Sequence, residues 1–137
     1  MASCIPSPRT MPFTSLLPSW LFRAAFWILC VAVGVLSLSP LDRLPPQIVD
    51  IWDKAQHATG FAVLALLGHL GYRRSPMLWI APGLLAYGAV IEVAQSATGW
   101  RQGDVLDWLA DAVGVGVGLA LAWLAVARDT RRRSDAQ

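Results

Sequence analysis

The stretch VLDWLADAVGVGVGLALAWLAVA, residues 105–127, is a long apolar segment that carries two aspartates near its start and no other charged residue. The hydrocarbon core of a bilayer is about 30 Å thick, and an α-helix needs about 20 predominantly apolar residues to cross it. The stretch is therefore predicted to be a membrane-spanning helix whose polar end lies near one membrane surface.

Three earlier segments have the same character. Residues 20–38 and 77–97 are each long enough to cross a bilayer. Residues 57–72 are short, but a helix that begins near Trp52 reaches the required length with its polar first turn among the lipid headgroups. The sequence thus predicts an all-α fold, a polytopic membrane bundle of four transmembrane helices at about 20–38, 52–72, 77–97 and 104–127.

The composition is typical of a membrane protein. Of the 137 residues, 55% are hydrophobic and 15% are charged, and the mean hydropathy is +0.50, well away from the balance of soluble domains. The lipid bilayer is therefore an expected partner. No nucleic-acid partner is expected, because the basic residues lie beside apolar segments and form no stripe on a polar face. Cys4 and Cys30 lie far apart and no metal-ligand spacing is present, so the sequence predicts no disulfide, metal or cofactor.

The basic residues predict an orientation. If both termini are cytoplasmic, eight of the eleven lysines and arginines lie on the inner side, and only Arg43, Lys54 and Arg101 lie outside. Cytoplasmic loops are enriched in basic residues, so we expect a multi-pass protein of the cell membrane with both termini inside. The expected organisation is a polar cytoplasmic leader at 1–19, a single transmembrane domain at 20–127 and a basic cytoplasmic tail at 128–137. The sequence does not indicate an oligomeric state.

This topology brings polar residues from three predicted helices to one membrane surface. In each helix the polar residues recur at steps of three or four, so they share one helical face. A charged side chain that faces lipid near the bilayer centre costs about 2.5–3.5 kcal/mol, so these faces are expected to point inward. Gly114 and Gly118 continue the last face, where small residues allow helices to approach closely. The predicted polar cluster consists of Asp53, Lys54, His57, Glu92, Gln95, Arg101, Asp104, Asp107 and Asp111.

The charged residues near the helix starts also have a structural interpretation. Asp53 is suited to cap the second helix, and Asp104 with Asp107 to cap the fourth and complement its dipole. Lys54 is typical of an interfacial cation whose aliphatic stem lies along apolar surface. For these residues the sequence leaves both a structural and a functional role open.

Glu92 is the hardest member of the cluster to explain by structure alone. It is the only glutamate in the chain and lies within an apolar helix, so a counter-charge is expected, either Arg101 or Lys54. His57 follows Asp53 by four residues, which indicates either a structural pair or a histidine that is oriented for acid–base chemistry.

Three segments resemble the motifs of the VanZ-like family of small membrane proteins in order and spacing: DKAQHATGF (53–61), IEVAQ (91–95) and WRQGDVLDWLADAVGVGVG (100–118). The resemblance covers residues 40–127. It departs from the family pattern at Asp111, where the family often carries Asn, so the site has an additional charge unless Asp111 is protonated. The family is named after a protein associated with low-level resistance to the glycopeptide teicoplanin, which implies an expected role in the cell envelope and in antibiotic resistance. The resemblance assigns to the family's motif positions Asp53, Lys54, His57, Glu92, Gln95, Arg101, Asp104, Asp107, Gly114 and Gly118.

Two classes of function and a structural alternative follow. In the first, the cluster binds or helps handle an anionic lipid or a lipid-linked envelope precursor, with Lys54 and Arg101 meeting phosphate. In the second, the chain is a small membrane enzyme that performs acid–base chemistry on a phosphorylated lipid. Its catalytic candidates are His57, Glu92 and Asp107, with the acids orienting the histidine or holding a divalent ion. In the third, the cluster is purely structural ion pairing. The sequence favours the first class and does not decide whether the chain is an enzyme.

Overall fold

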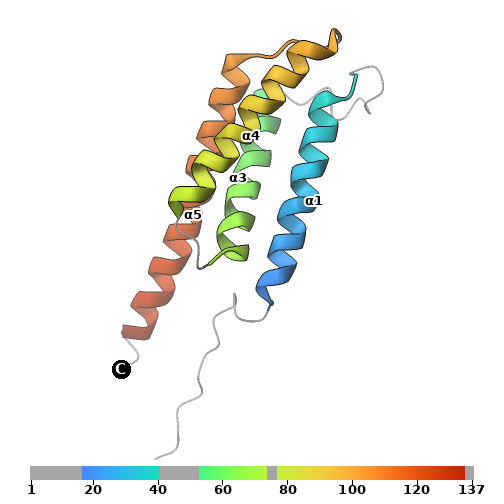
Figure 1. Cartoon of the computed structure of the whole chain (residues 1–137). Helices are drawn as coiled ribbons and strands as arrows, with labels where there is room; N and C mark the ends of the chain where they lie inside the picture. Colours follow the sequence, from blue (N-terminus) through green and yellow to red (C-terminus); the bar gives the residue numbers. More distant parts are fainter. Residues whose placement is uncertain (1–16, 41–52, 74–76, 135–137) are drawn as a thin grey trace, which may run out of the picture.

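The computed structural model describes residues 17–40, 53–73 and 77–134, which form four helices that alternate in direction along the chain (Figure 1). The predicted all-α fold is therefore confirmed. Because the directions alternate, α1 and α4 end where α3 and α5 begin, at the top of Figure 1. The helices are α1 at Ser19–Leu38, α3 at Asp53–Gly71, α4 at Met77–Thr98 and α5 at Val105–Ser134.

The helix boundaries lie within one residue of the prediction except at the C-terminus. There the sequence placed the end of the last helix at residue 127, but α5 continues through the basic segment to Ser134. Arginine is a good helix former, and these last turns extend past the other helices, so no apolar neighbour is needed to continue them (Figure 1). Outside the described residues lie most of the predicted leader and the basic residues Arg9, Arg43 and Arg74 that entered the orientation prediction.

Three of the described helices are long and apolar enough to cross a membrane, over Ser19–Leu38, Trp79–Thr98 and Val105–Arg128. Large apolar side chains also face outward on these helices. Ile28 of α1, Val93 of α4 and Val105 of α5 are each about 70% exposed, and further large apolar side chains of the same helices are exposed as well. Apolar length together with an apolar outer surface indicates a membrane protein.

Helix α3 is not among these three apolar spans, and it packs against all of them. It lies between α1 and α5 and also contacts α4 (Figure 1). Phe61, Leu64 and Ala65 of α3 are fully buried and form the centre of the core, and the Phe61 ring stacks on Tyr87 of α4 with 6.0 Å between the ring centroids. Since its neighbours shield it, α3 can carry polar residues at low cost.

A seam of glycines lets α5 pack closely against α3. At Gly114 a β-carbon would collide with the carbonyl oxygen of Ala58, and at Gly118 with that of Ala62. The two contacts are four residues apart on both helices, so α3 and α5 run in the same direction with a constant register. This parallel pair fixes where the polar first turns of both helices meet.

Candidate functional site

The first turns of α3 and α5 meet through one lysine. The Lys54 ammonium donates to Asp104 Oδ2 and to Asp107 Oδ1, both at 2.8 Å. Asp104 Oδ1 also accepts from the backbone N–H of Leu106 at 2.8 Å, so Asp104 caps α5 as its position in the sequence favoured. The hydrogen bond from Lys54 holds the pKa of Asp104 below its usual value. The stabilisation from this pair is therefore present at neutral pH and is lost as the pH falls through that lowered value.

Replacing Lys54 with methionine should lower the thermal stability of the chain, because the buried Asp107 carboxylate then has no cation and the cap of α5 loses its partner. Circular dichroism of the purified chain in detergent measures this as a fall in Tm at pH 7 that shrinks in acid. Arg128→Met removes an exposed charge on α5 and should leave Tm nearly unchanged. Equal effects of the two substitutions would contradict this role for Lys54.

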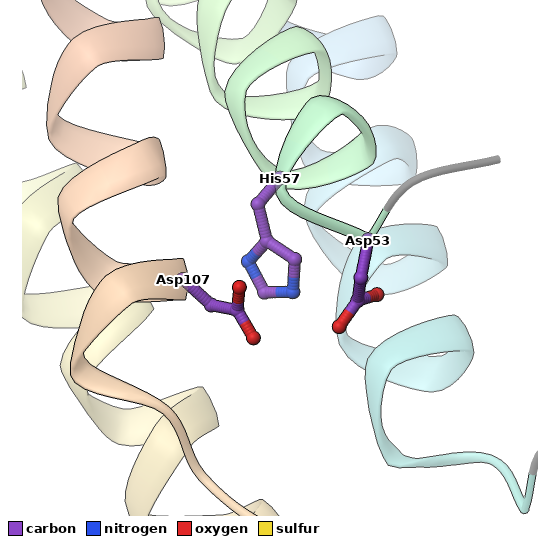
Figure 2. A group of neighbouring side chains, drawn as sticks. All are labelled: Asp53, His57 and Asp107. Atoms are coloured by element: carbon purple, nitrogen blue, oxygen red, sulfur yellow. The ribbon is translucent and has the colours of Figure 1, made fainter.

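His57 is held by an acid of α5 rather than by its neighbour in sequence. Its Nδ1 atom lies 2.9 Å from Asp111 Oδ1, and both side chains are buried. The expected partner, Asp53, instead forms a long ion pair with Arg101 at 3.8 Å. Figure 2 shows the imidazole ring between the carboxylates of Asp53 and Asp107. His57 therefore lies near carboxylates of both α3 and α5.

Glu92 contacts the start of α5 in a way that the sequence did not predict. Its Oε2 atom accepts from the backbone N–H of Asp104 at 2.7 Å, and its Oε1 atom lies 4.0 Å from His57 Nδ1. In the described part of the chain, neither Lys54 nor Arg101 forms the expected ion pair with Glu92. Lys54 is already held by the acids of α5, and Glu92 reaches a free N–H at the helix start instead.

Two further members of the cluster connect it to α1. Gln95 is 1% exposed, and its Nε2 atom donates to the carbonyl oxygen of Ser37 at 3.0 Å. Arg101 Nε donates to the carbonyl oxygen of Ser39 at 3.5 Å. All nine predicted cluster residues thus lie at the end of the bundle where α3 and α5 begin.

A cleft of about 90 Å³ leads from α1 to His57. The sequence did not predict that α1 would contribute to the site, because the apolar residues of α1 carry no polar signal. It also did not single out Gln56, although Gln56 lies inside the DKAQH segment, or Gly88, where a side chain would collide with the Asp111 carboxylate. The cleft is lined by Val33, Leu36, Ser37, Asp53, Gln56, His57 and Arg101.

The fold and the cluster together define a helical membrane protein with a buried polar site at one end of its bundle. Comparisons of the chain with protein-family models, curated proteins and solved structures found no match. Membership of the VanZ-like family therefore stays a prediction from the motif residues.

Proposed function

We propose that α3 is a fourth transmembrane helix. Its 19 residues span about 28 Å, close to the thickness of the hydrocarbon core. It lies alongside the three apolar helices and contacts each of them. Its charged residues Asp53 and Lys54 lie in the first turn, at the level expected for lipid headgroups, and His69 lies in the last turn near the opposite surface. With four spans, both termini lie on one side of the membrane, which the positive-inside rule assigns to the cytoplasm of the cell.

This topology predicts opposite labelling of the two ends of α5. Cysteines are introduced singly at the exposed residues Gln102 and Ser134, in a chain with Cys4→Ser and Cys30→Ala. An impermeant thiol reagent added to whole cells should label Gln102→Cys, and should label Ser134→Cys only after lysis. Gly99 is avoided because its φ of 79° disfavours any side chain. Labelling of both positions, or only of Ser134→Cys, in whole cells would contradict this orientation.

We propose that the chain is a VanZ-like membrane protein whose polar cluster binds or helps handle an anionic lipid or a lipid-linked envelope component at the outer membrane surface, with an effect on glycopeptide susceptibility. The cleft is the observation that supports lipid binding, because Arg101 and His57 both line it at the polar end of the bundle. Among the described residues the Arg101 guanidinium makes long contacts, a 3.8 Å ion pair with Asp53 and a 3.5 Å hydrogen bond from Nε to the carbonyl oxygen of Ser39, so it retains donors for a phosphate group.

Binding of a polyprenyl phosphate to the chain in phosphatidylcholine nanodiscs tests this proposal. Arg101→Gln should weaken saturable binding at least about tenfold, as expected when a charge-assisted hydrogen bond is lost. Arg131→Gln removes an exposed arginine far from the cleft and should bind like the wild type. Teicoplanin susceptibility of cells that express each variant should change in parallel with binding. Equal binding by the wild type and Arg101→Gln would contradict the proposal.

The short contact between His57 and Asp111 favours an enzyme as the second candidate function. A buried histidine held by a carboxylate at 2.9 Å is an arrangement suited to general acid or base catalysis. In that case the chain hydrolyses the polyprenyl phosphate: water attacks phosphorus, the P–O bond to the polyprenyl group breaks, and polyprenol and inorganic phosphate are formed. His57 transfers the proton, so turnover is lost in His57→Gln but not in His69→Gln. If none of these substitutions changes binding, turnover or susceptibility, the cluster is purely structural.

A further inference from the structure

Three buried side chains from three different helices meet beside the cleft. They are His57 of α3, Glu92 of α4 and Asp111 of α5, and each offers a nitrogen or oxygen atom within 4.8 Å of the other two. The exposed fractions of these residues are 7%, 9% and 0%. No short sequence spacing encodes this group, because its members come from separate parts of the chain.

Two carboxylate oxygens of this group have no hydrogen-bond partner among the described residues, although both are buried. Glu92 Oε1 is one of them, and it is directed toward His57 Nδ1 at 4.0 Å. Asp111 Oδ2 is the other, on the same carboxylate whose Oδ1 contacts His57. A buried carboxylate oxygen without a partner is costly, so a positively charged species is expected near Glu92.

The charge of the polar cluster points the same way. It contains five carboxylates, and its cations are Lys54, Arg101 and, when protonated, His57. Lys54 is hydrogen-bonded to Asp104 and Asp107, and the basic nitrogen that lies 4.0 Å from Glu92 Oε1 is His57 Nδ1. The carboxylates exceed the cations by two when His57 is protonated and by three when it is neutral, as a metal ligand must be, so a divalent cation lowers the net negative charge of the cluster in either case.

We infer that His57, Glu92 and Asp111 form a binding site for a divalent metal ion. A cation with ligands at about 2.0–2.2 Å separates neighbouring ligand atoms by about 3.0–3.5 Å. His57 Nδ1 is 2.9 Å from Asp111 and 4.0 Å from Glu92, so small side-chain rotations produce this geometry. One imidazole and two carboxylates suit Mn²⁺, which accepts both oxygen and nitrogen ligands.

Two further carboxylates lie near the ring. Metal-binding histidines usually donate their second N–H to a carboxylate, which fixes the tautomer. The His57 ring lies between the carboxylates of Asp53 and Asp107 (Figure 2), and these three side chains also offer atoms within 4.8 Å of one another. Coordination through Nδ1 displaces any proton on that nitrogen to solvent, so binding is expected to weaken as the pH falls.

Titration of the purified full chain with Mn²⁺, after removal of bound metal by a chelator, tests this site. The wild type should bind one Mn²⁺ per chain, and pulsed electron paramagnetic resonance should detect coupling to one histidine nitrogen. Glu92→Gln and Asp111→Asn keep the side-chain shape and should weaken binding at least about tenfold, since even loss of an outer-shell partner costs that much. His57→Gln should abolish the nitrogen coupling, and His69→Gln should preserve it.

The wild-type measurement keeps the inference testable even if a variant does not fold. Absence of saturable Mn²⁺ binding below about 1 mM, the weak end of biological cation sites, would overturn the site. Nitrogen coupling that is absent in the wild type, or that persists in folded His57→Gln, would also overturn it. The site depends on these side chains alone, so loss of lipid binding in Arg101→Gln neither supports nor weakens it.

Discussion

Replacing Gly114 with leucine should separate α3 from α5 and cost more than about 3 kcal/mol of stability. Even a single β-carbon at this position collides with the backbone carbonyl of Ala58, and backbone atoms of a packed helix cannot move aside as a flexible side chain can. Inserting groups into a packed interface typically costs about 1–3 kcal/mol, and leucine adds more than one group here. Unfolding of the purified chain in mixed micelles, followed by circular dichroism, measures the loss.

Gly116 provides a matched control on the same helix. A β-carbon at Gly116 meets no atom within 4 Å, and the residue is exposed on the outer surface of α5. Gly116→Leu should therefore be neutral, or stabilising by up to about 1 kcal/mol because leucine is the better helix former. If Gly114→Leu and Gly116→Leu gave equal stabilities, the close contact between α3 and α5 would be refuted.

The glycine seam also shows why much of the architecture was predictable from sequence. Long apolar runs reveal membrane helices because lipid permits few alternatives. The helical spacing of Asp107, Asp111, Gly114 and Gly118 placed these residues on one face, and in the structure all four residues of this face are buried. Local periodicity was sufficient for these inferences because each concerns a single helix.

The pairings inside the cluster were not predictable in the same way. The sequence favoured Asp53 as the partner of His57 because the two residues share a helical face, but the partner comes from α5. The rotation and depth of one helix against another depend on packing contacts such as that of Gly88 with Asp111. A single sequence contains no pattern that predicts such a contact between two helices. Glu92 illustrates the same limit, since its partner is a backbone N–H freed by the start of a different helix.

Replacing His57 with alanine should destabilise the chain by about 3 kcal/mol, near the lower end of the cost of breaking a buried ion pair. Asp111 is fully buried, and in the described part of the chain its only hydrogen-bond contact is with His57. Without the imidazole, the Asp111 carboxylate either stays charged in an apolar interior or must bind a proton. Unfolding in mixed micelles at pH 7 measures the loss, and His69→Ala should stay within about 0.5 kcal/mol of the wild type.

A second substitution separates the charge of Asp111 from the cavity that alanine leaves at position 57. Asp111→Asn in the His57→Ala chain replaces a stranded carboxylate by a neutral amide of nearly the same shape, so stability should be partly recovered. In the wild-type chain the same Asp111→Asn substitution should be destabilising, because it weakens a short charge-assisted contact. Opposite signs in the two backgrounds give a coupling free energy for the pair. If Asp111→Asn had the same effect in both backgrounds, His57 and Asp111 would not interact, and the common centre of the proposed metal site and of the acid–base alternative would be lost.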